Sequence, residues 1–470
     1  MKNTESAFNF KAFIRAVAVI AVPVALQNLL TTTGSMVDTM MVAPLGETTV
    51  GALGLCAQFS SLMFSCYWGF VGGGMLFFAQ YYGAKDEDGV CRAYGITFSF
   101  MMTVAAIFMV LGRFFPQQVM SVYTDKAHIA AIGVAYLRVV AFAYPLQIFS
   151  VCMCALLRST ERVRIPMFGA FASVGTNVLL NWMFIYGKLG LPAMGVKGAA
   201  LATMCAAIVN VLVIWLLALG TGYRYLFRFR SHFRFTGAFL REYLYKCFPI
   251  LCNELLIGVG FTVLNIVLGR QQEEAIAAIA VFRTMEGLVI SFFAGFSNAA
   301  SVLIGNRVGA GDLRGAYEYA KRLILLCGGC VALVCATLFA FHRPLLRLMS
   351  LSGESLRLGT IFLSIYCVAA VIRMSNWAQN DTFRAAGDAR TGTVLEISFM
   401  YAVVLPAVCL TGLVFRAPVA LVFLCCYIDE PIRFILMQRH LYSGKWIRPV
   451  TQAGKKALPG FLEELKKGKR

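Results

Sequence analysis

The chain has 470 residues, of which 59% are apolar and 14% are charged, whereas a soluble domain has about 45–50% and 25%. This composition excludes an ordinary soluble protein, so the formal net charge of +19 has to be explained for a chain that lies in a membrane. The 15 cysteines lie mostly inside apolar runs, and none has zinc-finger spacing with one of the 4 histidines. We interpret them as small core residues.

Twelve apolar segments follow one another along the chain, and a helix that crosses a bilayer needs about 20 such residues. The segments lack the alternation of membrane strands, and lipid favours helices because they satisfy their own backbone groups. The sequence therefore predicts an all-α polytopic membrane protein with twelve transmembrane helices. The expected spans are 13–42, 50–80, 91–111, 132–157, 165–186, 195–219, 243–269, 275–305, 317–341, 357–383, 391–413 and 417–440.

Most of the 42 lysine and arginine residues fall in the loops on one side of this arrangement, which is the side of both termini. Basic loops usually face the cytoplasm, so we expect both termini there and the protein in the plasma (cytoplasmic) membrane. The basic tail could bind nucleic acid, but a solvated tail near anionic lipid explains it better. The expected partners are a small-molecule substrate and membrane lipids, without nucleic acid, and we expect a monomer.

The longest loop on this side, 223–246, is rich in arginine and aromatic residues and separates the first six spans from the last six. We interpret it as a cytoplasmic linker between an N-terminal lobe, 1–222, and a C-terminal lobe, 247–442. A basic cytoplasmic tail follows at 443–470.

The two halves of the sequence are related at a constant offset. The offset places Pro23 on Pro249, Glu47 on Glu273, Gly83 on Gly309, Asp86 on Asp312 and Arg158 on Arg384. Because six spans is an even number, both halves enter the membrane from the same side. The sequence therefore predicts two six-helix lobes related by a parallel repeat, with a site between them near the midplane.

Several short motifs resemble those of the multidrug and toxic compound extrusion (MATE) family. They are Met36-Val37-Asp38-Thr39-Met40, Gly46, the Ala52-Leu-Gly start of the second span, Gly305 to Asp312, Arg384-Ala-Ala-Gly-Asp388 and Ser443-Gly-Lys-Trp446. The first half has Arg158-Ser-Thr-Glu-Arg162 in place of the Arg384 motif, and we interpret this motif as a cytoplasmic loop. The resemblance covers nearly the whole chain. It implies a MATE-like fold around a central cleft and the export of small molecules against entry of protons or sodium ions.

Asp38 is the leading candidate for ion coupling. It lies in the outer half of the first span among threonines and a serine, without a basic residue nearby in the sequence. An ionisable group inside a bilayer is costly and is a functional candidate by default, although a structural hydrogen-bonding role is the alternative. Burial away from any cation favours the protonated carboxyl group, which would let Asp38 take up and release a proton.

Asn177 and Asn181 are four residues apart on the fifth span and therefore share a helix face, and Thr203 on the sixth span could join them. The resemblance implies that these three residues and Asp38 line the ion pocket of the first lobe. Related proteins often have an aspartate in place of Asn181, which weakens a relay of several acids here. Amide hydrogen bonds between neighbouring helices are an equal alternative.

The second lobe has its own candidates, Glu254 and Asn253 in the seventh span. The resemblance implies that Glu254 acts as the acid of this lobe, and the alternative is an ion pair with Arg373 or Arg283. Arg373 and Glu286 are weaker candidates for substrate contact, and Asp429 and Arg433 are expected to pair on one helix face. Glycines such as Gly305 and Gly309 are expected at close helix contacts, and Pro23 and Pro249 at kinks.

We favour an antiporter, coupled to H⁺ or Na⁺, that exports small amphipathic compounds, cationic or zwitterionic, by alternating access of the two lobes. No cofactor is expected beside the coupling ion, and no bound metal beside Na⁺. The alternative is a flippase for lipid-linked saccharides of the same broad superfamily, but such proteins often carry extra spans and several central arginines. An enzyme is disfavoured because the chain has no H-E-x-x-H or G-x-S-x-G motif, and a scaffold would not explain isolated buried acids.

Overall fold

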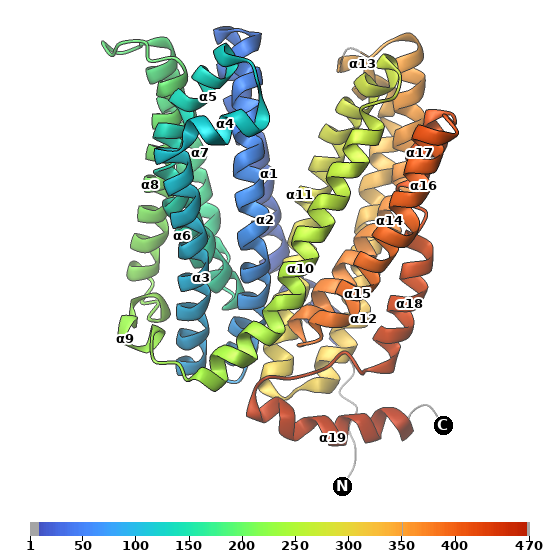
Figure 1. Ribbon diagram of the computed structural model, residues 1–470. Coiled ribbons are helices and arrows are strands. Elements are labelled where there is room, and N and C mark those ends of the chain that lie inside the picture. Colours follow the sequence, from blue (N-terminus) through green and yellow to red (C-terminus); the bar gives the residue numbers. More distant parts are fainter. Residues whose placement is uncertain (1–8, 350, 468–470) are drawn as a thin grey trace.

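A computed structural model describes residues 9–349 and 351–467. Throughout this part of the chain the regular structure is helical, in two groups of helices that lie close together at one end and diverge toward the other (Figure 1). The first group contains α1 (Phe10–Val42), α2 (Glu47–Gly83), α3 (Glu87–Phe114), α4 (Pro116–Tyr123), α5 (Ala127–Val140), α6 (Ala143–Ser159), α7 (Arg164–Tyr186) and α8 (Val196–Gly220).

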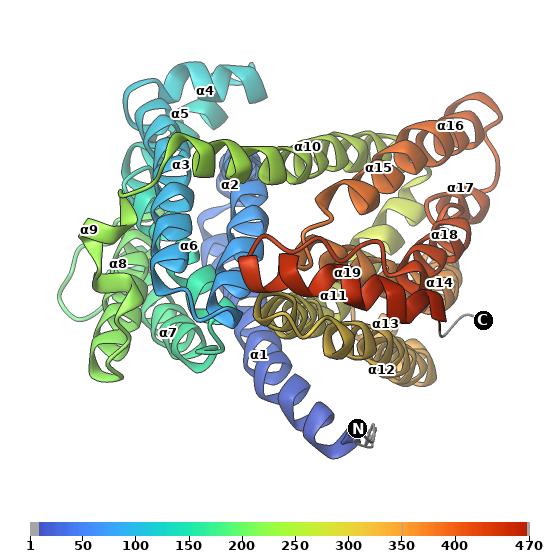
Figure 2. The same ribbon diagram turned by 90° about the horizontal axis from the view of Figure 1, so that it is seen from below.

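The second group begins after a linker with two short helical turns, η2 (Tyr225–Phe227) and α9 (Phe229–His232). It contains α10 (Gly237–Leu268), α11 (Glu273–Ala310), α12 (Leu313–Ala340), α13 (His342–Leu348), α14 (Gly353–Ala385), α15 (Ala389–Phe399), α16 (Leu405–Cys409), α17 (Val419–Cys425) and α18 (Glu430–Ser443). The π-helical segment η3 (Met400–Val404) joins α15 to α16, and a second one, η4 (Leu410–Val414), continues the helix, so that Ala389–Val414 is one span. The last helix, α19 (Gln452–Lys467), crosses the end of the molecule where the two groups meet (Figure 2).

Ten helices in the described part of the chain are long and apolar enough to cross a membrane, and the bent pair α5 and α6 makes an eleventh. This pair is bent by 53° at a short break within the span expected at 132–157. The last expected span, 417–440, is divided by a turn into α17 and α18 and carries the charged residues Asp429, Glu430 and Arg433. The structure therefore confirms a polytopic all-α protein and shows that its last segment is broken and charged.

The repeated Gly-Ala-x-Asp motif ends one helix and starts the next. Asp86 accepts a hydrogen bond from the Gly89 amide at the start of α3, and Asp312 accepts one from the Gly315 amide at the start of α12. An aspartate that satisfies a free N–H group in this way is a preferred helix N-cap. The motif thus fixes the same sharp turn in both halves.

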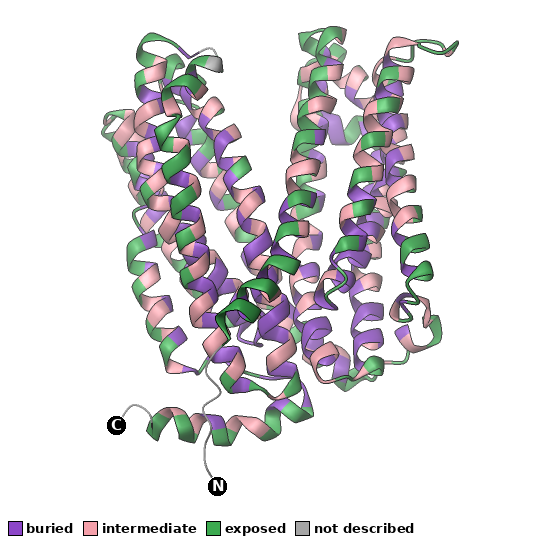
Figure 3. Ribbon diagram, turned by 180° about the vertical axis from the view of Figure 1, so that it is seen from behind, coloured by how far each residue is buried: buried purple, intermediate pink, exposed green. Residues whose placement is uncertain are grey.

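Glycines bring the two lobes into close contact at the α19 end. A methyl group on Gly83 would overlap the Asn306 backbone, and one on Gly309 would overlap the Gln80 backbone. The constant offset between the halves places Gly83 on Gly309 and Gln80 on Asn306, so each of these contacts is the repeat equivalent of the other. This is expected for two halves related by a two-fold axis. We call this contact, together with Gly73 against Cys247, the seam. Buried residues are concentrated in this part of the molecule (Figure 3).

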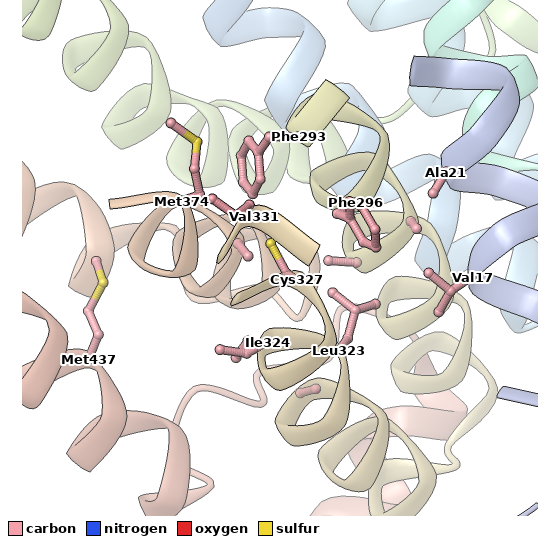
Figure 4. Packing of buried hydrophobic residues seen from close by; sticks show 14 of the residues in the cluster. Val17, Ala21, Phe293, Phe296, Leu323, Ile324, Cys327, Val331, Met374 and Met437 are labelled. Carbon is pink, nitrogen blue, oxygen red and sulfur yellow. The ribbon is translucent and has the colours of Figure 1, made fainter. Parts of the chain in front are cut away.

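Each lobe also contributes the beginning of its first helix to the core of the other lobe. Phe13 and Val17 of α1 lie in the hydrophobic cluster of the second lobe, and Phe239 and Tyr243 of α10 lie in that of the first. Figure 4 shows Val17 and Ala21 beside side chains of α11 and α12. The two pairs of residues occupy equivalent positions of the two halves. Both first helices begin at the α19 end, so the repeat is parallel and its axis runs along the helices.

The C-terminal segment lies against the protein. Residues 446–467, which we call the strap, run from the buried Trp446 across the α19 end to α19. The Thr451 hydroxyl donates to the Gly309 carbonyl at 2.8 Å, Lys455 lies 3.7 Å from Glu242, and the Phe461 ring packs on Tyr317. The described part of the tail expected at 443–470 is therefore a docked segment and not a free one, although its lysines Lys455, Lys456, Lys466 and Lys467 are exposed to solvent as expected. The linker expected at 223–246 is also shorter, because α10 already begins at Gly237.

Candidate functional site

A cavity of about 670 Å³ lies between the two lobes, with walls from α1, α2, α6, α7, α8, α11 and α14. This is the size of a pocket for a small organic molecule. Its wall on α2 is aromatic, because Phe64 stacks on Trp68 at 4.8 Å and Tyr67 lies beside them. Charged groups line it as well, namely Arg158, Asp381 and Arg384. The cavity can therefore hold an amphipathic molecule in contact with both apolar and charged walls.

Asp38 and the two asparagines of α7 form one hydrogen-bonded cluster inside the first lobe. The Asn181 side-chain amide donates to the Asp38 carboxylate at 2.6 Å and lies 3.1 Å from the Asn177 carbonyl oxygen. Asn181 is fully buried, whereas Asp38 and Asn177 are half-buried. Among the described residues, no lysine or arginine lies within 4 Å of Asp38. The structure thus brings three of the four first-lobe candidates together around a carboxylate that has no cationic partner.

Thr203 joins this cluster only indirectly. Its hydroxyl donates to the Ala199 carbonyl of its own helix at 3.0 Å. Tyr136 of α5 lies near both Thr203 and Asp38. Sequence reasoning missed Tyr136. A tyrosine in an apolar span is common, and no spacing links it to a residue so distant in the sequence.

Glu254 has a different partner from the two arginines expected. It lies 3.2 Å from Arg384 of α14, which is also 3.8 Å from Asp381. Asp381 accepts a further hydrogen bond from Ser297 of α11. The proposed pairing of Glu254 with Arg373 or Arg283 is therefore wrong, and so is the interpretation of Arg384 as part of a cytoplasmic loop. Arg384 is in the last turn of α14, where its side chain is only 13% exposed.

Arg373 and Glu286 lie inside the second lobe and are absent from the wall of the central cavity. They pair at 2.8 Å, and Arg283 binds the other oxygen of Glu286 at 2.6 Å. Glu430 is 2.8 Å from Arg433, and Asp429 is 3.5 Å from the same arginine, as expected for this pair. These buried charges neutralise one another within the lobe, so direct contact of Arg373 or Glu286 with a substrate in the cavity is not supported.

Asn253, adjacent to Glu254, points to another acid. Its amide donates to Glu396 of α15 at 3.1 Å, and the Asn380 amide donates to the same oxygen at 2.9 Å. Asn253 and Glu254 therefore serve two separate networks, one in the lobe interior and one beside the cavity. Asp381 and Arg158 were missed as wall residues, because they lie at the ends of spans, where charged residues are common.

The chain matches the family model described as MatE over residues 23–183 and again over 249–409. The "Probable multidrug resistance protein YoeA" of Bacillus subtilis is 24% identical over 408 residues, which is 83% of this chain and 85% of that protein. The "Probable multidrug resistance protein NorM" of Neisseria meningitidis serogroup A is 24% identical over 348 residues, covering 73% of this chain and 75% of that protein.

Solved structures show the same fold. A crystal structure of a mutant of the Vibrio cholerae MATE transporter VcmN aligns with a TM-score of 0.83 at 15% identity, over 96% of this chain and 98% of that one. A structure described as the outward-facing conformation of a multidrug resistance MATE family transporter aligns with a TM-score of 0.81 at 18% identity, over 92% and 96%. The two family matches cover most of the chain, and they begin at Pro23 and Pro249, which are equivalent positions of the two halves. The chain therefore belongs to the MatE family of multidrug efflux transporters.

Proposed function

We propose that the chain is an antiporter that uses an ion gradient, with a proton as the preferred ion, to export small amphipathic compounds through the central cavity. The observation that carries this proposal is the Asp38 carboxylate, which is held by the Asn181 amide and has no cation within 4 Å among the described residues. A half-buried carboxylate of this kind can accept a proton without breaking an ion pair. The hydroxyl and amide groups around it can bind either protonation state.

Protonation changes what Asp38 can accept from its neighbours. The charged carboxylate is a strong acceptor for the Asn181 amide, and a neutral carboxyl group loses part of this attraction. α1 and α7 would then be free to shift, and α1 also extends into the core of the second lobe through Phe13 and Val17. A proton bound at Asp38 could therefore change the contact between the lobes as well as the cavity wall on α1.

The lobes would export their substrate by alternating access. The described structure is closed at the seam and widens away from α19, and it resembles the solved transporter described as outward-facing. We propose that the α19 end faces the cytoplasm, that the protein lies in the plasma membrane, and that it works as a monomer. The basic residues of the linker and the strap support this orientation. The flippase alternative is not favoured, because Glu254 and Asp381 offset the charges of Arg158 and Arg384, the two arginines on the described cavity wall, and leave no excess positive charge for a phosphate.

The test is transport of a fluorescent cation into proteoliposomes under a pH gradient or a sodium gradient, imposed one at a time. Asp38→Asn imitates the neutral carboxyl group, so we expect the gradient-driven rate to fall about tenfold or more, since coupling energies of about 1–3 kcal/mol are typical. Substrate binding and the amount of folded protein should persist. Normal transport by Asp38→Asn under a pH gradient, together with an inactive Glu254→Gln, would place the coupling site in the second lobe and favour sodium.

A further inference from the structure

The end of the cavity nearest the seam carries two arginines that are equivalent in the repeat but have unlike surroundings. Arg158 of α6 and Arg384 of α14 occupy corresponding positions of the two halves, and both line the cavity. Arg384 lies between the carboxylates of Glu254 and Asp381. The residues at the corresponding positions of the first half are Asn28 and Ala155. The repeat therefore supplies two similar cations, and the sequence neutralises only one of them.

Arg158 is held by neutral groups. Its guanidinium donates to the Gln27 carbonyl oxygen at 2.7 Å and to that of Asn298 at 3.4 Å. In the described part of the chain, no carboxylate lies within 4 Å of it, and its buried Nε–H has no acceptor. A buried charge without a counter-ion is costly, and a guanidinium with free donors suits a carboxylate, which can accept two parallel hydrogen bonds.

The opposite charge is available close by. Glu254 and Asp381 share the single guanidinium of Arg384. These three side chains together carry one net negative charge when both acids are ionised. Asp381 is bound by Ser297, and the next residue, Asn298, binds Arg158. Ser297 and Asn298, which are consecutive on α11, therefore link the Asp381 carboxylate to the Arg158 guanidinium. This end of the cavity is neutral as a whole, with its two charges at separate places.

We propose that this end of the cavity is a binding site for zwitterionic amphiphiles, in which Arg158 holds the anionic group and the Glu254–Asp381 pair attracts the cationic group. A zwitterion satisfies both charges and leaves the site neutral, whereas a simple cation leaves Arg158 without a counter-ion. The apolar body of the molecule would lie against Phe64 and Trp68 of α2. This inference rests on the proposed export function and names its substrate class.

The experiment compares two dyes with the same apolar body. Rhodamine B is a zwitterion at neutral pH, and its ethyl ester is a cation. Binding of each dye to the purified full-length protein in detergent is measured by fluorescence anisotropy. The wild type should bind rhodamine B more tightly than the ester. Arg158→Gln should weaken binding of rhodamine B about tenfold or more, since hydrogen bonds between charged groups are the strong ones, and should leave the ester bound as well or better. Arg158→Lys should retain a preference for rhodamine B.

Two further variants separate this effect from general damage. Asp381→Asn should weaken both dyes, because both carry the cationic group. Arg162→Gln makes the same change at an exposed arginine just after the end of α6 and should change neither. Equal weakening of both dyes by Arg158→Gln, or a wild type that prefers the ester, would overturn the proposal. If binding behaves as expected but neither dye is transported under an ion gradient, the binding site stands and the export function fails.

Discussion

At the scale of single residues, His232 shows how the linker is held. It is 3% exposed, its ring lies 5.0 Å from that of Tyr94 on α3, and its Nε2 is 2.8 Å from the Tyr225 carbonyl oxygen. Burial lowers the pKa of His232 below its usual value, and the contact with Tyr225 only partly opposes this shift. The docked linker therefore favours neutral histidine. Its stabilising effect is complete above the ordinary pKa of about 6.5 and is lost as the pH falls.

Acidification should therefore loosen the linker. We expect hydrogen exchange of the amides in residues 224–236, corrected for the intrinsic rate, to increase between pH 7 and pH 5. His232→Gln should remove this dependence, whereas the same change at the exposed His128 should preserve it. An identical pH response in the wild type and in His232→Gln would show that another group controls the docking.

The substitution Glu254→Gln tests how much the ion pair between Glu254 and Arg384, beside the cavity, contributes to the stability of the protein. Glu254→Gln leaves the mostly buried Arg384 with Asp381 alone, at 3.8 Å. Removing one partner of a buried pair is costly, and because Asp381 remains we expect a loss of about 1–3 kcal/mol in the free energy of unfolding. Glu354→Gln breaks an exposed pair with Arg357 at 3.3 Å and should cost less than about 1 kcal/mol. Thermal unfolding in detergent would compare them, and equal losses would contradict the buried pairing.

At the scale of helices, the glycines of the seam differ in what they touch. A methyl group on Gly73 meets the Cys247 side chain, whereas one on Gly309 meets the Gln80 backbone. Either alanine substitution should destabilise the closed seam by about 1–3 kcal/mol, the usual cost of overpacking. Cys247→Ala should recover part of the loss in Gly73→Ala and none in Gly309→Ala, because only a side chain can be shortened. The midpoint of thermal unfolding measures the loss in each glycine variant and its recovery by Cys247→Ala. Equal recovery in the two variants would contradict the different contacts of Gly73 and Gly309.

The helices and the repeat could largely be predicted from the sequence, because apolar length and a constant offset are properties of the chain itself. The Asn177–Asn181 face was predictable for the same reason, since a spacing of four residues fixes it. The partners of Glu254 and Arg158 were not predictable, because they depend on how the lobes pack. The broken span at α17 and α18 was also missed, because its charged residues are paired inside the lobe rather than exposed to lipid.

At the scale of the whole molecule, the strap lies across the α19 end and contacts both lobes. Val450 belongs to the core of the first lobe, while α19 packs on α11 and α12 of the second. Deleting residues 452–470 should therefore make opening of the seam more frequent. Cys247 is 1% exposed beside Gly73, so its thiol can report this opening.

A variant that keeps only Cys247 should react several-fold faster with a maleimide after the deletion. A variant that keeps only Cys205, on α8 of the first lobe and far from the seam in sequence, provides the control and should react at an unchanged rate. Unchanged labelling of Cys247 would mean that the strap does not restrain the seam.

The buried Gln80 side chain makes opening of the seam depend on the entry of water. It is fully buried on α2, accepts from the Val450 amide at 2.8 Å and donates to the Ala385 carbonyl at 2.8 Å. Because Ala385 belongs to α14 of the second lobe, separation of the lobes breaks the bond to its carbonyl, and each polar group left without a partner then costs about 1–3 kcal/mol until water reaches it. Partial opening without hydration is therefore the least favourable state. The seam should open in one step in which water enters as the helices part, and solutes that lower the activity of water should hold the transporter closed at this end.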